Sequence, residues 1–229
     1  MGTNVTWYGH AALGLETGGL RLLVDPYFTG NPAASTRADN VTADYILVSH
    51  GHGDHLGDTV AIAKRTGATV ISNDEIAGWL EKQGVKKTHG QHLGGGFKYP
   101  FGYLKLTQAI HGSALPDGSN GGNPAGFLLT TTDGKKIYLA QDTGLFGDMR
   151  MIGEEGIALA ALPIGDNYTM GPADALQAIK LIQPQHVIPI HYNTYKMITQ
   201  DAQAWRDQVE SQTSAKVHVL KPGESYFLE

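Results

Sequence analysis

Short apolar runs joined by glycine turns dominate the beginning of the chain. Residues 5–8, 12–16 and 21–24 form three such runs, and Thr17-Gly18-Gly19 separates the last two. Apolar runs of four to eight residues bounded by turn residues predict β-strands. We therefore expect three strands here, with a hairpin turn between the second and the third.

Strands and helices alternate through the rest of the chain. The apolar run at residues 45–48 predicts a buried strand. Pro172 begins a segment in which Leu176 and Ile179 repeat at the helical period, so it predicts an amphipathic helix with proline in its first turn. The same criteria predict further strands at residues 69–71, 103–109, 127–131, 136–139, 157–162, 186–190, 216–220 and 225–228, and helices at residues 58–65, 74–83 and 201–212.

This order of elements predicts an α/β fold in which two packed sheets carry helices on their outer faces. We expect one domain over residues 1–229, because no Pro/Ser-rich linker divides the chain. The later part follows the plan of the earlier part, although no repeated sequence proves two similar halves. Residues 112–126 form one long irregular segment, and such a loop is often functional, for example as a lid. A plain surface excursion is the alternative.

Composition excludes several classes of protein. The 30 glycines exceed the usual share of about 7% and fit a chain with many tight turns. A net charge of −5 disfavours nucleic acid as the partner. The chain has no cysteine, so it has no disulfide, no thiolate ligand and no cysteine nucleophile.

The sequence also contains no membrane or export signal. No stretch approaches the roughly 20 apolar residues that span a bilayer. The first residues lack the positive region and apolar run of a signal peptide. We expect a cytoplasmic protein, although the absence of cysteine is compatible with other compartments.

Three histidines and an aspartate stand within six residues, directly after a predicted strand. Alternate residues of an extended segment point to the same side, so His50 and His52 can bind one ion together. A tighter turn at Gly53 lets Asp54 and His55 face a second position. Imidazole and carboxylate suit Zn²⁺, Fe or Mn²⁺. A polar loop with clustered histidines is the alternative, and ten histidines among 229 residues make that clustering improbable by chance.

Further ligands are expected at the ends of later strands. His111, Asp142 and His191 each follow an apolar strand directly or within two residues. A zinc ion takes about four ligands, and a catalytic zinc ion leaves one position for water. Taken alone, each residue would be an ordinary strand-end residue, but with the first cluster the three complete a metal site.

This series of residues resembles the metallo-β-lactamase superfamily over nearly the whole chain. Asp25 before Pro26 matches the early aspartate of that superfamily, which supports the metal loop and is not a ligand. The segments beginning at Gly9, Asp142 and His191 resemble a small group of bacterial and archaeal metal-dependent hydrolases. That group is related to the ascorbate-6-phosphate lactonases and, more distantly, to N-acyl-phosphatidylethanolamine phospholipase D. The matching residues are His50-X-His52-X-Asp54-His55, His111, Asp142-Thr143-Gly144, Gly9-His10-Ala11 and His191-Tyr192-Asn193-Thr194.

The resemblance implies a four-layer αββα sandwich with two divalent metal ions at one edge of its sheets. Zinc is favoured, with manganese or iron as alternatives. Two cations about 3.5–4 Å apart share a water, lower its pKa and present hydroxide to the bond that is cleaved. Asp54 is further expected to orient that hydroxide or to pass a proton to the leaving group. The implied ligands are His50, His52 and His111 for one ion, and Asp54, His55 and His191 for the other, with Asp142 bridging both.

Residues beside these ligands are candidates for catalysis and substrate binding. His10, in a glycine turn after the first strand, is expected to serve catalysis beside the metals, and a structural turn histidine is the alternative. We expect Tyr192 and Asn193, which follow the last ligand, to contact the substrate. Tyr168, in the polar break before the Pro172 helix, is a third substrate-binding candidate. Four other histidines are expected to be ordinary surface or core residues: His89, His92, His186 and His218.

The expected function is therefore hydrolysis of a small, soluble, anionic ester by a metal-bridged hydroxide, with a lactone or a phosphodiester as the foremost substrates. The chain is too short for the extra domain of nucleic-acid-processing members of the superfamily. A non-catalytic metal-binding module is one alternative, and a metal-dependent nuclease, which would need a basic groove, is another. We expect a small molecule as the partner, no nucleic acid and no membrane, and a homo-oligomer, as is common among related enzymes.

Overall fold

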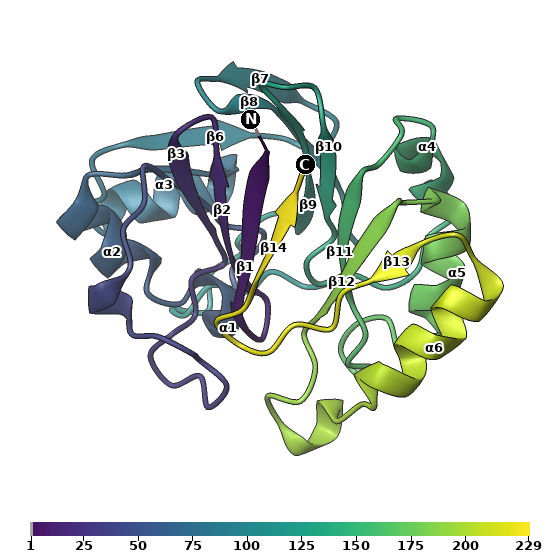
Figure 1. The fold of residues 1–229 in the computed structure, drawn as a ribbon. Helices are drawn as coiled ribbons and strands as arrows, with labels where there is room; N and C mark the ends of the chain where they lie inside the picture. The colour runs from purple at the N-terminus through teal and green to yellow at the C-terminus, as the bar shows by residue number, and fades with distance from the viewer. Residues whose placement is uncertain (1) are drawn as a thin grey trace.

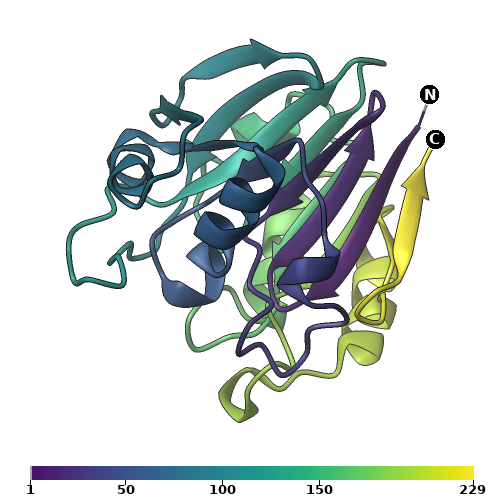
Figure 2. The ribbon, with the colours of Figure 1, turned by 90° about the vertical axis from the view of Figure 1, so that its left-hand side faces the viewer.

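Two seven-stranded β-sheets face each other, and helices cover the outer face of each sheet (Figure 1). The computed structural model describes residues 2–229. Helices α2 and α3 lie outside the first sheet, and α4, α5 and α6 lie outside the second (Figures 1 and 2). The expected αββα fold class is confirmed.

The first sheet contains an antiparallel part and a parallel part. Strands β14, β1, β2 and β3 pair antiparallel, and β3 to β6 pair parallel. Helices α1, α2 and α3 lie in the connections between its parallel strands, as such connections require. In spatial order the strands are β14 (Ser225–Leu228), β1 (Thr3–Gly9), β2 (Ala12–Thr17), β3 (Leu20–Val24), β4 (Tyr45–Leu47), β5 (Thr69–Asn73) and β6 (Thr88–Gln91), and the helices are α1 (Gly53–Leu56), α2 (Thr59–Thr66) and α3 (Asp74–Lys82).

The second sheet repeats this plan. Strands β13, β12, β11 and β10 pair parallel, and β10 to β7 pair antiparallel. In spatial order the strands are β13 (Lys216–Val217), β12 (His186–Ile190), β11 (Leu159–Pro163), β10 (Lys136–Leu139), β9 (Ala125–Thr131), β8 (Gly102–Gln108) and β7 (Gly96–Tyr99), and the helices are α4 (Met149–Gly153), α5 (Pro172–Ile182) and α6 (Ala202–Gln212).

The main hydrophobic core lies between the sheets. Large side chains from both inner faces, Leu13 and Leu22 in the first sheet and Phe127 and Leu139 in the second, are completely or almost completely buried. A smaller cluster that includes Ile62, on α2, lies between the first sheet and its helices. Shortening one of these leucines to alanine would cost roughly 2–5 kcal/mol of stability. The core therefore fixes the two sheets relative to each other, and with them the edge at which their strands end.

The strand directions bring several strand ends to one edge of the sandwich. In the first sheet, β1 runs in the same direction as β3 and β4, because two antiparallel pairings separate β1 from β3. In the second sheet, β8 likewise runs in the same direction as β10 and β12. The residues that follow these six strands are those singled out in the sequence, so the topology itself gathers them.

Most predicted elements are confirmed. Strands β6 and β7 and the short helices α1 and α4 were not predicted. Helix α2 begins one residue later than predicted, after Asp58. The Asp58 carboxylate does not cap the helix, because it accepts hydrogen bonds from the backbone amides of Phe28 and Thr29 instead. The strand predicted at residues 216–220 is only two residues long. No helix among residues 2–229 has both the length and the apolar character needed to cross a bilayer.

Candidate metal centre

Four site residues at or just beyond the ends of strands have left-handed backbone conformations. His10, Asp25 and His191 follow β1, β3 and β12 with φ of 56°, 44° and 54°, and Gln141 follows β10 by two residues with φ of 52°. Residues other than glycine rarely have positive φ. The turn ends each strand abruptly and keeps the side chain at the edge of the sandwich, where such backbone strain commonly accompanies a functional site.

His50, His52 and His111 form the first cluster. One ring nitrogen from each lies within 4.8 Å of those of the other two. His50 Nε2 is 3.0 Å from His52 Nδ1, and His50 Nδ1 is 2.9 Å from the Ser49 hydroxyl. Burial lowers the pKa of His50 well below its usual value and also lowers that of His111. Both imidazoles are therefore neutral at pH 7, which is the form that binds a metal ion.

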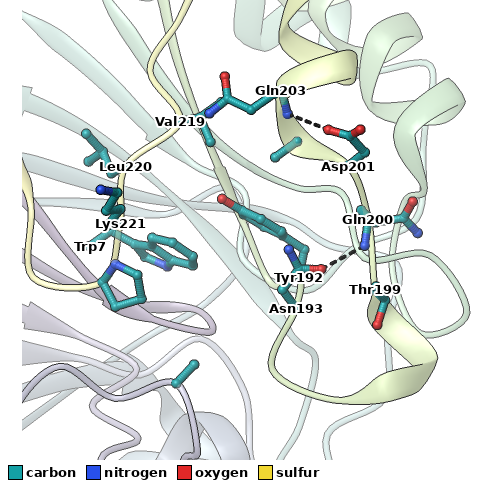
Figure 3. A pocket seen from close by; sticks show the side chains of 13 residues that line it. Trp7, Tyr192, Asn193, Thr199, Gln200, Asp201, Gln203, Val219, Leu220 and Lys221 are labelled. Atoms are coloured by element: carbon teal, nitrogen blue, oxygen red, sulfur yellow. Dashed lines mark hydrogen bonds between the residues drawn. The ribbon is translucent and has the colours of Figure 1, made fainter.

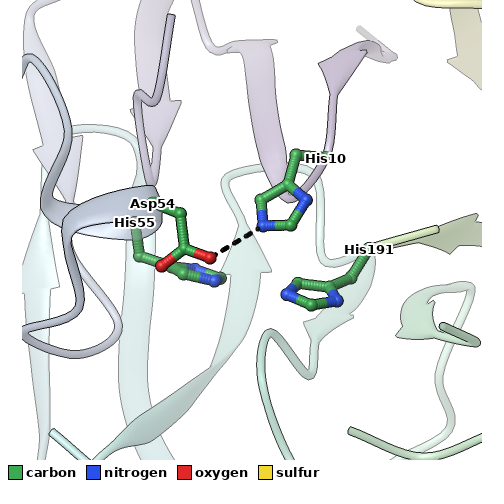
Figure 4. Close-up of side chains that lie close together, drawn as sticks. All are labelled: His10, Asp54, His55 and His191. Carbon is green, nitrogen blue, oxygen red and sulfur yellow. Dashed lines mark hydrogen bonds and ion pairs between the residues drawn. The ribbon is translucent and has the colours of Figure 1, made fainter. Parts of the chain in front are cut away.

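His10, Asp54, His55 and His191 form the second cluster, in which all four side chains point toward one another (Figure 4). Asp54 and His55 come from helix α1, while His10 and His191 come from the ends of β1 and β12. The three histidines are buried, and the Asp54 side chain is 36% exposed. Asp54 is therefore the member of this cluster that solvent or a substrate reaches most easily.

Asp142 lies between the two clusters. Its Oδ2 is 3.4 Å from Nε2 of His111, in the first cluster, and 3.1 Å from Nε2 of His191, in the second. Its Oδ1 is 3.2 Å from Nε2 of His55. The side chain is only 3% exposed. One buried carboxylate thus faces ligand atoms of both clusters, which is the place that a bridging ligand would occupy.

Several buried atoms of this group make no hydrogen bond of acceptable geometry, although some face each other at 3.1–3.2 Å. They are His55 Nε2, Asp142 Oδ1 and both ring nitrogens of His191. A buried polar atom without a partner costs about 1–3 kcal/mol, so several of them at one point indicate a ligand that completes the site. Nitrogen and carboxylate oxygen, without sulfur, are the donors that zinc, manganese and iron accept. The residues present therefore fit a pair of divalent ions.

Asp25 supports the site from behind. Its carboxylate accepts hydrogen bonds from the Ser49 amide (2.8 Å), the Ser49 hydroxyl and Gln141 Nε2 (2.6 Å), and it lies 2.7 Å from His55 Nδ1. Both of its oxygens are thus engaged by the protein. Although burial opposes protonation, Asp142 and Asp25 raise the pKa of His55 well above its usual value. Asp25 therefore orients His55, as carboxylates behind metal-binding histidines commonly do.

His10 holds Asp54 in the same way. Its Nε2 is 3.2 Å from Asp54 Oδ2, and its Nδ1 is 2.9 Å from the Thr194 hydroxyl. Burial lowers the pKa of His10 to about 4. Burial alone would raise the pKa of Asp54, but the hydrogen bond from His10 and the nearby His55 lower it below its usual value. Because ionised Asp54 can only accept, Nε2 of a neutral His10 donates to it, and Thr194 donates to Nδ1.

The three predicted substrate-binding residues lie in two different places. Tyr168 is 54% exposed, and its hydroxyl is 3.7 Å from the Met197 sulfur. Tyr192 is 4% exposed, and its ring stacks on Trp7 at 5.2 Å. Together with Asn193 it lines a cavity of about 660 Å³ in front of α6 that contains none of the seven predicted metal ligands (Figure 3). Substrate binding by Tyr192 and Asn193 stays a prediction that this placement does not favour.

Two tyrosines beside the second cluster were missed in the sequence. The hydroxyls of Tyr27 and Tyr195 are 2.7 Å apart, and each ring centroid lies 5.8 Å from that of His10. Both stand within two residues of segments that the sequence did single out, at Asp25 and Thr194. Neither has a residue type or spacing that sets it apart from the other tyrosines of the chain, so only the folded structure identifies them.

The irregular segment 112–126 is held against the metal loop. The Ser113 hydroxyl accepts a hydrogen bond of 3.1 Å from the amide of Gly51, the residue between the predicted ligands His50 and His52. Asn73 Nδ2 donates to the carbonyls of Gly121 and Asn123 at 2.6 and 2.9 Å. The segment is thus tied to the metal loop and to the end of β5, and these contacts favour a support over a lid.

Comparisons with known proteins agree with this geometry. The β-lactamase superfamily domain matches residues 20–192. The chain is 49% identical over 233 residues to a UPF0173 metal-dependent hydrolase of Heliobacterium modesticaldum, covering 98% of this chain and 97% of that one. It is 48% identical over 225 residues to one of Thermus thermophilus, covering 98% and 99%. The structure of a metallo-hydrolase from the archaeon Ignicoccus hospitalis superposes with a TM-score of 0.92 at 38% identity, covering 100% and 99%.

Proposed function

The chain belongs to the β-lactamase superfamily, among its UPF0173 metal-dependent hydrolases, and from this premise we propose that it hydrolyses a small soluble ester with two metal ions. The position of Asp142 carries the proposal. Its buried carboxylate faces His111 of one cluster and both His55 and His191 of the other. Such a shared ligand serves a site with two ions and would be out of place in a site with one.

The two clusters support the following set of ligands. His50, His52 and His111 would hold one ion, and Asp54, His55 and His191 the other, with Asp142 shared. When bound, such a pair of ions lowers the pKa of water and polarises the bond to be cleaved. Asp25 orients His55, and His10 orients Asp54.

Asp54 is the residue that we assign to proton transfer. It is more exposed than the other members of its cluster, and only one of its oxygens is bonded to His10. An ionised carboxylate in this position can take up a proton and pass it to the leaving group. His10 is then a positioning residue, because both of its ring nitrogens are engaged by Asp54 and Thr194.

Charge supports an anionic substrate, with a lactone or a phosphodiester as the first candidates. Two dications exceed the charge of the two carboxylates, Asp54 and Asp142, that would bind them, so the centre would attract an anion. The histidine ligands add no negative charge. The proposed partner is therefore a small anionic molecule.

Metal content tests the proposal. We expect about two equivalents of zinc, manganese or iron in the untagged protein by plasma mass spectrometry, and a sharp fall in an Asp142→Ala variant. Hydrolysis of lactones and phosphodiesters by the protein loaded with that metal would then identify the reaction. Well under one equivalent that neither the substitution nor added metal changes would refute the two-ion site.

The same experiment separates the alternatives. Two equivalents of metal without turnover of any substrate in the screen would favour a non-catalytic metal-binding module. Cleavage of plasmid DNA or of RNA that disappears in Asp142→Ala would favour a nuclease.

A further inference from the structure

Four apolar side chains lie on loops at the edge of the sandwich that carries the second cluster. We call Tyr27, Tyr168, Tyr195 and Met197 the apolar rim. Tyr168, Tyr195 and Met197 are 54%, 41% and 62% exposed, and Tyr27 is half-buried. They come from three separate loops, which follow β3, β11 and β12. Large apolar side chains on a protein surface normally occur singly, and contiguous groups mark places where something binds.

The apolar rim consists of two contacting pairs, one of which contacts the second cluster. The hydroxyls of Tyr27 and Tyr195 are 2.7 Å apart, and the Tyr168 hydroxyl is 3.7 Å from the Met197 sulfur. The rings of Tyr27 and Tyr195 each meet the His10 ring at 5.8 Å, edge on. His10 in turn contacts Asp54 at 3.2 Å. An unbroken series of contacts therefore joins exposed apolar surface to the carboxylate that we assign to proton transfer.

Rigid aromatic rings beside a polar centre are typical of small-molecule sites, where apolar walls bury the ligand and a few polar groups orient it. Tyr27 and Tyr195 fix each other through their hydroxyls, so their ring faces are held in place before any ligand arrives. Other exposed large apolar residues, among them Tyr103 on β8 and Met151 on α4, lie on elements that carry no residue of the second cluster. They provide a matched comparison for the apolar rim.

We propose that the apolar rim receives an apolar, ring-sized part of the substrate, next to the bond that is hydrolysed and on the Asp54 side. This inference rests on the proposed function and narrows its substrate class. The substrate would be amphiphilic, with a polar reacting group at the metal clusters and an apolar group on the side of the leaving group. Simple polar esters without such a group would bind less tightly.

Binding of two hydroxamic acids tests the inference without any turnover. Both acids bind zinc through the same group, but benzohydroxamate carries a phenyl ring and acetohydroxamate a methyl group. In titration calorimetry on the zinc-loaded protein, we expect benzohydroxamate to bind about tenfold more tightly, the effect of burying one ring face. A Tyr195→Ser/Met197→Ser double variant should lose this preference and keep its affinity for acetohydroxamate.

Three further variants make the result specific. Tyr195→Phe should keep the preference, because it retains the ring. Tyr103→Ser/Met151→Ser removes equally exposed side chains elsewhere and should also keep it. Tyr168→Ser alone should weaken the preference, and it provides a second reading if the double variant folds poorly.

Two outcomes would count against the inference in different ways. If the Tyr195→Ser/Met197→Ser protein is folded and still prefers benzohydroxamate as the wild type does, the apolar rim does not bind the ring, and the metal centre stands. If zinc-loaded wild type binds neither hydroxamate, the proposed metal centre itself fails, and the inference fails with it.

Discussion

Asp25 shows how a residue that is not expected to bind metal can control the affinity for it. An Asp25→Asn substitution keeps the size of the side chain but replaces one acceptor oxygen with a donor. The new NH₂ group would face donors at Ser49, His55 or Gln141, all of which now bond to the carboxylate. His55 would lose its fixed orientation toward Asp142.

We expect Asp25→Asn to weaken metal binding by about 10–100-fold, measured by competition with a chelator. Asp44→Asn is the matched control, because Asp44 accepts a backbone hydrogen bond from Arg21 at the surface of the same sheet. Unchanged metal affinity in Asp25→Asn would show that His55 needs no carboxylate behind it.

The seven predicted ligands could be found in the sequence because metal binding restricts residue type. Only histidine and acidic residues serve here, and three histidines and an aspartate within six residues are conspicuous. The structure brings all seven together at one edge. Tyr27 and Tyr195 could not be found in this way, because any apolar residue can form the wall of a pocket. Tyr192 was placed beside the substrate from its position after His191, yet its ring lies in a cavity that contains no ligand.

At the scale of elements, segment 112–126 has more contacts than its composition suggests. Asn73 has two roles at the end of β5. Its Oδ1 accepts a hydrogen bond from the Ile76 amide and so caps helix α3. Its Nδ2 donates hydrogen bonds to the carbonyls of Gly121 and Asn123. Asn73→Asp separates the two, because aspartate caps a helix equally well but cannot donate.

We expect Asn73→Asp to release the segment and leave α3 intact. Amide hydrogen exchange at residues 113–123 should become at least about tenfold faster, since the carbonyls of Gly121 and Asn123 both lose the Asn73 donor. Exchange in α3 should stay as in the wild type. The control variant Asn40→Asp, at an exposed position of the first sheet's long loop, should change exchange neither at residues 113–123 nor in α3. Unchanged exchange at residues 113–123 would mean that other contacts hold the segment.

The two strands that the sequence analysis missed share a physical reason. Strand β6 reads Thr-His-Gly-Gln and β7 reads Gly-Phe-Lys-Tyr, so neither has a clear apolar pattern. Each lies at the end of its sheet, where pairing with one neighbour through the backbone is sufficient. The central strands were predicted correctly, because burial on both faces requires nearly continuous apolar sequence. The pairing of β14 with β1, across more than 200 residues, leaves no local pattern at all.

At the scale of the whole molecule, that pairing makes the C-terminal strand a link between the two sheets. Tyr226 on β14 stacks on His218 at 3.8 Å and lies 5.2 Å from His186, which begins β12 of the second sheet. The two histidines are 3.0 Å apart, from Nδ1 of His186 to Nε2 of His218. Partial burial is the main reason that the pKa of each histidine is lowered. The nearby Lys135 lowers the pKa of His186 further, and His186 lowers that of His218 further.

The lowered pKa values give the stability of the fold a defined dependence on pH. The unfolded chain takes up protons at these histidines near pH 6.5, before the folded protein does. The stability contributed by the neutral pair is therefore complete above about pH 6.5 and is lost as the pH falls below it. Protonation would place two cations in contact at the junction of the sheets. We expect the melting temperature of the metal-free wild type to fall between pH 7.5 and pH 5.5, and to fall less in a His218→Gln variant, which cannot be charged at this position.

His92→Gln is the matched control for this titration, because His92 is an exposed histidine directly after β6, at the opposite end of the first sheet from β14. It should leave the difference in melting temperature between the two pH values as it is in the wild type. Metal-free protein is required, because loss of metal at acidic pH would otherwise lower the melting temperature for a separate reason. If His218→Gln loses as much stability as the wild type on acidification, the pair does not couple the sheets to pH, and protonation of the buried histidines at the metal edge would be the remaining source.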